Sequence, residues 1–228
     1  MGRSYSQHCS LAHALDVVGE RWTLLIVREL MAGPRRYTDL ADGLVTVPSN
    51  VLAARLKDME SNGLIERRPL PAPAASVVVY ELTESGESLG TAVTELARWG
   101  QRTLPPERED RFFRVHWLVL ALRASFDPAA ASGLTESYEF VVDGDSISFE
   151  LVDGEGVARV GSPNARPAVV VTADADTLLA LTSDAISGSE AIARGARIEG
   201  ATAAIRRMRR VLPSRRVKRS EDHEEAVA

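Results

Sequence analysis

Apolar residues in the first third of the chain recur every three or four positions, which is the spacing of an amphipathic helix. The clearest series are Leu11, Leu15 and Val18, followed further on by Leu52, Leu56 and Met59. Gly19 follows the first series, and Gly63 follows the second, where glycine readily adopts the left-handed conformation that ends a helix. The pattern predicts four successive helices, over residues 9–19, 21–33, 37–44 and 49–62.

Polar residues that commonly cap helices mark where the third and fourth of these helices begin. Thr38 is a plausible cap for the third helix. For the fourth helix either Thr46 or Ser49 fits, and the sequence does not decide between them.

The pattern changes from helical to extended after residue 63. Residues 64–70 and 77–83 are β-forming runs, and the proline- and alanine-rich segment 71–75 between them indicates a hairpin loop. A closing helix over 84–104 carries apolar residues along one side, namely Leu89, Val93, Leu96 and Trp99. Four helices, a hairpin and a further helix form the element order of a winged helix-turn-helix.

The segment TLPPERED, residues 103–110, combines two prolines with a charge run and separates two periodic regions. It predicts a first domain over 1–104, a linker over 105–110 and a second domain over 111–212. The charged segment 213–228 has no periodicity, and we expect it to be a disordered tail.

The second region reads as α+β. A helix with an aromatic face is predicted over 111–126. Alternating strands follow over 136–142 and 145–152, and Asp143-Gly144 between them signals a hairpin turn. The remaining predicted elements are strands within 156–161 and 167–173, a helix over 174–185 capped by Asp174 or Asp176, a short helix, an extended stretch ending at Gly200, and a final helix.

Composition narrows the class of protein. The chain has 228 residues, 45% of them hydrophobic and 26% charged, as in ordinary globular proteins. No run of about 18 apolar residues is present, and the polar N-terminus lacks an apolar signal region, so we expect a cytoplasmic protein without membrane contact. The formal net charge of −5 does not favour nucleic-acid binding, so any DNA contact must come from local basic clusters.

The outward side of the helix predicted over 49–62 has an unusual composition for a surface helix. It presents small and hydrogen-bonding residues rather than a row of Glu and Lys, namely Ser49, Asn50, Ala53, Ala54 and Lys57. Small residues allow close approach to DNA, and Asn suits a bidentate contact with adenine. The alternative is a solvated helix face, on which Asn and Ser near the start serve as caps.

Residues 8–102 closely resemble the HxlR-type family of bacterial transcriptional regulators. The features that carry the resemblance are Cys9 before the first helix, Trp22 at the start of the second, the turn Gly33-Pro34-Arg35-Arg36-Tyr37, the segment NVLAARLKDMESNGLIER, and Leu82-Thr83-Glu84 with Gly86 after the hairpin. The resemblance implies a winged-helix dimer, paired through its first and last helices, on a palindromic operator in double-stranded DNA. It also implies that 49–62 is the recognition helix.

Candidate DNA contacts follow from this assignment. The wing loop has no Lys or Arg at its tip, so phosphate contacts must come from arginines at its base and at the earlier turn, unless these are solvated or paired with acids. The candidate set is Arg35, Arg36, Thr38, Ser49, Asn50, Ala53, Ala54, Arg55, Lys57, Arg67 and Arg68.

The segment from the strand at 169–173 to the final helix resembles the sterol carrier protein type-2 fold. This resemblance implies a sheet covered by helices, with an apolar tunnel that holds a lipid or similar hydrophobic effector. The alternative is a filled core that serves only dimerisation or spacing. The candidate ligand-binding residues are Phe112, His116, Trp117, Leu120, Tyr138, Phe140, Phe149, Leu178, Leu181 and Met208.

Cys9 is the one cysteine of the chain, so an intrachain disulfide and a cysteine-rich zinc site are excluded. It lies just before a predicted helix, where aligned N–H groups lower a thiol pKa. The family it resembles includes members that sense electrophiles or oxidants through a cysteine at this place. The alternative is an inert small hydrophobic residue, and His8 and His13 nearby do not complete a metal site.

The sequence shows no phosphate loop, nucleophile elbow or metalloprotease motif, so we expect neither an enzyme nor a cofactor. The leading hypothesis is a homodimeric, ligand-responsive regulator, more specifically a repressor released by a hydrophobic small molecule. One alternative is a thiol-based redox sensor that acts through Cys9. Another is a lipid-binding or sequestering protein whose winged helix makes protein contacts.

Overall fold

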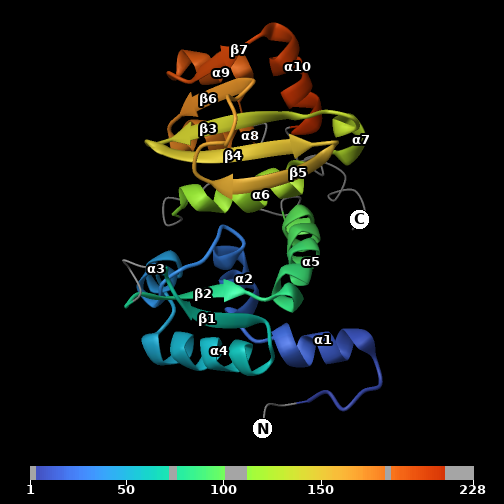
Figure 1. Cartoon of the computed structure of the whole chain (residues 1–228), viewed down its shortest axis with the longest axis vertical. Coiled ribbons are helices and arrows are strands. Elements are labelled where there is room, and N and C mark those ends of the chain that lie inside the picture. The colour runs from blue at the N-terminus through green and yellow to red at the C-terminus, as the bar shows by residue number, and fades with distance from the viewer. Residues whose placement is uncertain (1–3, 72–75, 101–111, 183–185, 214–228) are drawn as a thin grey trace, which may run out of the picture. The chain divides into compact units, whose positions relative to one another are not determined.

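The computed structural model describes residues 4–71, 76–100, 112–182 and 186–213. The chain forms two compact units, Met1–Glu95 and Leu96–Ala228, and each is described by itself (Figure 1). The linker predicted at 105–110, the tip of the hairpin loop and the charged tail beyond Pro213 lie outside the described residues.

The N-terminal unit has the predicted element order. Its elements are α1 (Ser10–Val18), α2 (Thr23–Leu30), α3 (Tyr37–Gly43), α4 (Ser49–Ser61), β1 (Ile65–Pro69), β2 (Val78–Leu82) and the start of α5 (Glu84–Gly100). The two strands pair antiparallel from Ile65↔Leu82 to Pro69↔Val78. The four helices, the hairpin strands and the following helix expected from the sequence are therefore confirmed.

Two predicted helix caps are wrong. Thr38 lies inside α3, which begins at Tyr37, and the backbone N–H of Arg36 donates to the Asp39 carboxylate at 2.9 Å. Neither Thr46 nor Ser49 caps α4, because the helix begins at Ser49 directly after the extended residue Pro48. Pro48 is itself the N-cap residue, and its side chain has no acceptor, so no side chain caps the first turn of α4.

The apolar stripe of α4 forms part of the core of the N-terminal unit. Leu52, Leu56 and Met59 are fully buried, together with Ile26 and Leu40 from the preceding helices. At the other end of the unit, Gly86 lets α5 approach the chain before β1, since a Cβ there would lie 2.0 Å from the Leu64 carbonyl oxygen.

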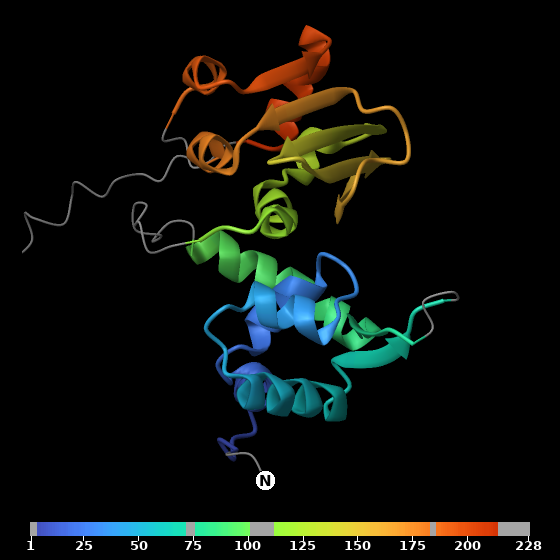
Figure 2. The same ribbon diagram turned by 90° about the vertical axis from the view of Figure 1, so that its left-hand side faces the viewer.

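The C-terminal unit is a five-stranded sheet of order β5-β4-β3-β6-β7 with helices (Figure 2). Its strands are β3 (Glu136–Val142), β4 (Asp145–Val152), β5 (Glu155–Val160), β6 (Val169–Ala173) and β7 (Arg197–Gly200). Its helices are η1 (Val115–Trp117), α6 (Leu118–Ser125), α7 (Pro128–Ala131), α8 (Ala175–Thr182), α9 (Gly188–Ala193) and α10 (Thr202–Val211). The sheet and the later helices match the sequence prediction.

The register assigns the two faces of this sheet. Tyr138 pairs with Phe149 across β3 and β4, and Phe140 pairs with Val171 across the parallel β3–β6 ladder. These side chains are buried, and α6, α8 and α9 lie to one side of the strands (Figure 2). The alternate positions, such as Glu139 and Glu150, form the second and more polar face.

Some of the turns, caps and helix starts predicted for the second unit agree with the structure, and others do not. The predicted turn at Asp143-Gly144 is confirmed, with φ of 51° and 92°, and Asp174 rather than Asp176 caps α8 by accepting from the Thr177 N–H at 2.7 Å. The helix predicted from residue 111 is wrong at its start, because the described residues before Val115 are not helical. The short α7 was missed, although Asp127 before Pro128 is a recognisable start signal.

Candidate nucleic-acid interface

The helices α3 and α4 are joined by a short connection and held together at their starts. The Tyr37 hydroxyl, on the first residue of α3, donates to the carbonyl oxygen of Ser49 at the start of α4, with an O···O distance of 2.9 Å. The β1–β2 hairpin follows α4 directly. Two linked helices followed by a hairpin define a winged helix-turn-helix, in which α4 has the position of the recognition helix.

The buried stripe of α4 determines which of its side chains face outward. At about 100° of rotation per residue, Asn50, Ala53, Ala54 and Lys57 fall within an arc of about 100° roughly opposite the buried Leu52–Leu56–Met59 stripe. All four are exposed, as is Ser49. The first turn of α4 contains no acidic residue, so its free N–H groups are favourable for a phosphate. The structure therefore brings Asn50, Ala53, Ala54 and Lys57 onto one accessible face, while Ser49, exposed at the first position of the helix, lies outside that arc.

The four predicted phosphate-binding arginines differ in their surroundings. Arg36 is exposed at the start of α3, beside the exposed Thr38. Arg67 is exposed and its guanidinium carbon lies 5.5 Å from the centre of the Tyr80 ring. Arg68 instead donates to Glu81 on the paired strand, which neutralises it locally.

Arg35 is half-buried and ties the connection before α3 to the hairpin. Its backbone N–H donates to the Tyr80 carbonyl at 2.9 Å, and its carbonyl accepts from the Tyr80 N–H at 2.7 Å. Its side-chain Nε is buried without a hydrogen-bond partner. Arg35 therefore fixes the backbone here, and Arg36 and Arg67 are the more accessible cations.

Arg55 has two acidic partners within its own chain. Its Nη2 lies 3.2 Å from Glu20 Oε2, and its Nη1 lies 3.3 Å from Asp58 Oδ2. Its side chain is only 16% exposed. Among the predicted DNA contacts on α4, Arg55 is thus the one that the structure places away from the exposed face.

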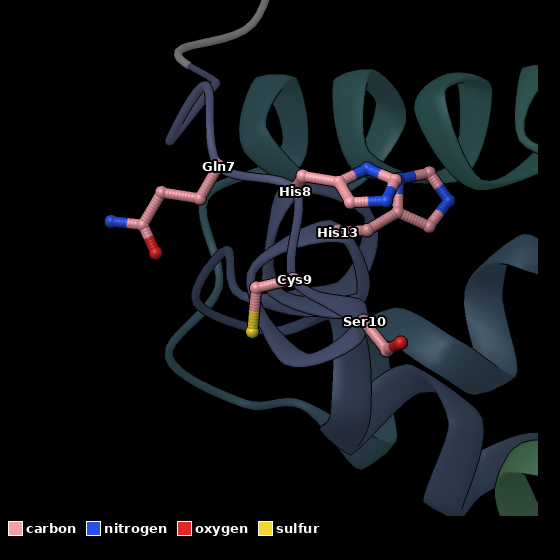
Figure 3. A pocket seen from close by; sticks show the side chains of 5 residues that line it. All are labelled: Gln7, His8, Cys9, Ser10 and His13. Atoms are coloured by element: carbon pink, nitrogen blue, oxygen red, sulfur yellow. The ribbon is translucent and has the colours of Figure 1, made fainter.

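Cys9 is exposed at the start of α1, in a shallow depression lined also by Gln7, His8, Ser10 and His13 (Figure 3). The backbone N–H groups of Ala12 and Leu11 stabilise the thiolate and lower the pKa of Cys9. The sulfur points to a different side from the two imidazole rings (Figure 3). Among the described residues no group of three or more side chains could hold a metal ion.

The predicted ligand-binding residues divide into a buried and a more exposed group. Tyr138, Phe140, Phe149, Leu178 and Met208 are buried, whereas His116, Trp117, Leu120 and Leu181 are half-buried and Phe112 is exposed. The rings of Phe112 and Trp117 meet in a tilted arrangement, with 5.4 Å between their centres. Phe149 packs on Phe126 at 5.3 Å, and a Cβ on Gly156 would lie 2.5 Å from the Phe149 ring. The sequence interpretation missed the role of Gly156 in accommodating these rings.

A polar cluster occupies the inner side of the sheet beside Phe149. The Tyr138 hydroxyl donates to Glu136 Oε1 at 2.6 Å. Arg207 of α10 donates to the same carboxylate through Nε at 3.0 Å and Nη2 at 2.7 Å. The hydrogen bond from Arg207 lowers the pKa of Glu136, and burial, then Glu136, raises the pKa of Tyr138. The Tyr138 hydroxyl, which belongs to one of the candidate ligand-binding residues, is thus already bonded within the chain.

Comparisons with known proteins agree with the geometry of the N-terminal unit. Residues 17–108 match the family described as HxlR-like helix-turn-helix. The transcriptional regulator YodB of Bacillus subtilis is 34% identical over 93 residues, which are 41% of this chain and 82% of YodB. A protein of Mycobacterium bovis named as an HTH-type transcriptional regulator is 42% identical over 96 residues, and the chain spans 60% of its length. The solved reduced form of YodB shows 32% sequence identity and a TM-score of 0.38, covering 45% of this chain and 100% of that one.

The chain belongs to the HxlR-like helix-turn-helix family. The family match ends at residue 108, so most of the five-stranded sheet unit lies beyond it. Within the described residues, no helix has both the length and the apolar character needed to cross a bilayer.

The surroundings of Cys9 give a prediction for its reactivity with pH. Because backbone N–H groups stabilise the thiolate, alkylation by iodoacetamide should reach its half-maximal rate below the pH of an ordinary thiol, about 8.5. The chain has one cysteine, so the labelling rate reports this thiol alone. The same chain unfolded in urea is the reference, and identical midpoints in the two states would contradict the prediction.

Proposed function

We propose that this HxlR-type transcriptional regulator binds a palindromic operator as a homodimer and represses transcription until a hydrophobic small molecule binds its C-terminal unit. The observation that supports DNA reading most directly is the exposed face of α4, which carries Asn50, Ala53, Ala54 and Lys57 opposite a buried apolar stripe. A helix that only covers a core has no need of a face built from small and hydrogen-bonding residues.

Each residue type on this face has a physical role in the proposal. Ala53 and Ala54 let the helix axis approach the major groove closely, and Asn50 supplies the donor and acceptor pair that matches adenine. Lys57, Arg36 and Arg67 neutralise phosphates on either side of the groove. The net charge of −5 gives no general attraction to DNA, so the salt dependence of the DNA affinity should correspond to the few phosphate contacts that these cations make.

Exposed apolar residues support the homodimer. Leu11 and Leu15 lie exposed on α1, and Leu96 and Trp99 lie exposed on α5, with exposures of 67% for Leu11 and 56% for Trp99. Two-fold pairing through such strips would bury them. It would place two copies of α4 about 34–36 Å apart, one turn of DNA, which is the reason for a palindromic operator.

The effector is the part of the proposal that depends on the second unit. Its sheet, covered on one side by helices, is compatible with a sterol-carrier-like fold, and its inner face carries apolar groups from separate elements, including Phe140, Leu178 and Met208. A ligand that binds one dimer geometry better than another would shift the protein toward that geometry and so change its operator affinity. Because such coupling is reciprocal, DNA would change the ligand affinity by the same factor.

A second candidate function is thiol-based sensing of electrophiles or oxidants. The observation that favours it is the exposed Cys9 thiol with a lowered pKa at the start of α1. Because α1 carries the exposed Leu11 and Leu15, an adduct on Cys9 would disturb the proposed dimer directly. Loss of operator binding after treatment with a quinone or diamide in the wild type, but not in Cys9→Ser, would support this function, and an equal response in both would exclude it.

The Asn50 side chain gives the first test of DNA reading. Selection from random-sequence DNA with the wild-type protein supplies an operator duplex, and Asn50→Ala should weaken binding to that duplex by about 1–3 kcal/mol because a bidentate base contact is lost. Binding to a random duplex should change little. Titrations of both duplexes by fluorescence anisotropy measure the two effects.

Asn62→Ala is the matched control, because Asn62 is exposed at the opposite end of α4 and its side chain bonds the Asp58 carbonyl. It should leave operator binding close to that of the wild type. Equal losses for Asn50→Ala on the operator and on random DNA would show that Asn50 does not read bases.

Substitutions confined to α1 are enough to test the proposed dimer. Leu11→Arg combined with Leu15→Arg places charges in the proposed interface and should convert a dimer into a monomer at micromolar concentration in sedimentation equilibrium. His13→Arg, an exposed residue on the other side of α1, should leave the dimer intact. A wild-type protein that is itself monomeric at this concentration would overturn the dimer and the palindromic operator.

The effector proposal predicts binding of fatty acyl, sterol-like or polycyclic aromatic molecules to the C-terminal unit. Such a ligand should raise the melting temperature and lower operator affinity, and Leu120→Trp should abolish both responses by filling space while retaining DNA binding. Val152→Trp, on an exposed residue of the same unit, is the matched control. A broad apolar panel that changes neither melting nor DNA binding of the wild type would refute the effector.

A further inference from the structure

We propose that Arg55 is a positioning residue for DNA reading, which sets the orientation of α4 through its ion pair with Glu20 and does not itself contact DNA. This inference rests on the proposed role of α4 as the recognition helix. It gives a role in specificity to a residue outside the DNA-facing surface.

The position of Arg55 on α4 separates it from the DNA-facing residues. At about 100° per residue, Arg55 is about 140° around the helix from Asn50 but only about 60° from Leu52. Its side chain is 16% exposed, and its Nε is buried without a hydrogen-bond partner. Arg55 therefore lies on the flank of α4, between its buried stripe and its exposed face.

The partners of Arg55 connect α4 to a distant part of the chain. Asp58 belongs to α4 itself, so that pair fixes the guanidinium but joins no separate segments. Glu20 is 35 residues away in sequence, in the connection between α1 and α2. The pair Arg55–Glu20 is thus a tie between the recognition helix and the end of the helix that carries the exposed Leu11 and Leu15.

The connection that holds Glu20 is conformationally defined. The N–H of Gly19 donates to the Leu15 carbonyl at 2.8 Å, and the chain passes through Trp22 with φ of 85°, an uncommon value for a residue other than glycine. The Arg21 guanidinium carbon lies 5.0 Å from the centre of the Trp22 ring. Glu20 therefore projects from a constrained turn, which makes it a useful anchor.

The pair has little value for stability. The Glu20 and Asp58 side chains are 66% and 58% exposed, and ion pairs with such exposed carboxylates contribute little to folding because water screens them. DNA reading requires a more exact orientation of α4 than folding does, because base contacts depend on placing a side chain to within about half an ångström. The apolar stripe holds α4 against the core, and the ion pair restrains its tilt and rotation.

The alternative is that Arg55 leaves Glu20 and binds a phosphate. The two roles predict opposite effects for Glu20→Gln. If Arg55 binds a phosphate, loss of the competing Glu20 carboxylate strengthens that contact. The removal of any negative charge near DNA also generally strengthens binding. If Arg55 positions α4, Glu20→Gln removes its ion-pair partner, so operator affinity falls although the protein becomes less negative.

The test uses the full chain, the operator duplex from selection and a random duplex, each titrated over a series of salt concentrations. The variants are Arg55→Ala, Glu20→Gln, the double variant of these two, and the charge reversal Arg55→Glu with Glu20→Arg. Glu60→Gln is the control for charge removal, because Glu60 is an exposed acid of α4 without an ion pair in the described structure. Thermal melts confirm that each variant is folded, and Glu20→Gln, a change at an exposed site, keeps the test valid if Arg55→Ala does not fold.

Under the proposal, Arg55→Ala and Glu20→Gln each weaken operator binding about two- to fivefold, because the effect is limited to the modest free energy of a solvent-exposed ion pair. The double variant is no weaker than the single ones, and the charge reversal recovers part of the loss. Binding of Glu20→Gln to the random duplex does not weaken, the dependence of binding on salt stays close to that of the wild type, and Glu60→Gln does not weaken operator binding.

The opposite pattern overturns the positioning role. In that pattern, Glu20→Gln binds the operator as well as or better than the wild type. Arg55→Ala weakens binding to both duplexes, and the slope of log affinity against log salt concentration falls by about the value expected for one phosphate contact. A wild-type protein that prefers no DNA sequence would refute the proposed function, and this inference with it. A selective wild type whose selectivity survives Glu20→Gln refutes the positioning role alone.

Discussion

The burial of one side of α4 is the constraint on which the N-terminal unit depends. Leu52, Leu56 and Met59 are at most 2% exposed, so rotation of the helix about its axis would move apolar groups into water. This fixes the opposite side outward, and with it Asn50, Ala53, Ala54 and Lys57. The surface available to DNA is therefore a consequence of core packing, and the residues on it are free to serve recognition because they contribute little to the core.

Charge is arranged locally rather than globally in this protein. A net charge of −5 would repel a polyanion, and several arginines near α4 and the hairpin are already paired, Arg68 with Glu81 and Arg55 with Glu20 and Asp58. Arg36, Arg67 and Lys57 remain exposed. If these three are the cations that meet phosphates, the protein would bind random DNA weakly, and selective binding would depend on base contacts and on the second copy in a dimer.

The C-terminal unit combines an apolar inner face with a polar cluster. Tyr138 and Arg207 both donate to the Glu136 carboxylate, which joins α10 to the sheet. A polar cluster whose hydrogen bonds are satisfied favours one arrangement of the helix on the sheet over others. Phe126, Phe149 and Gly156 fill the space nearby. An effector that contacted Tyr138 or Phe149 would therefore compete with contacts already present in the chain, whereas Trp117 and Leu120 are only half-buried.

Much of the fold was determined by local sequence. Helical spacing at Leu52, Leu56 and Met59, alternation along β3 and β4, and the Asp143-Gly144 turn each act over a few residues, and each was predictable because the side chain and the backbone it specifies are neighbours. The order of elements and the residues on the outer face of α4 followed from the same patterns. Cys9 was identifiable too, because its lowered pKa depends on N–H groups of the helix that it precedes.

Only the tertiary structure decided which charged side chains are available. Arg55 and Arg67 are similar in sequence terms, yet Arg55 meets a carboxylate 35 residues away while Arg67 lies over Tyr80 and stays exposed. The Glu136 carboxylate accepts a hydrogen bond from Tyr138 and another from Arg207, which is 71 residues away in sequence. Gly156 matters because two aromatic rings from other elements meet there. Such pairings depend on distances between segments set by packing of the whole unit, and no local pattern in the chain encodes them.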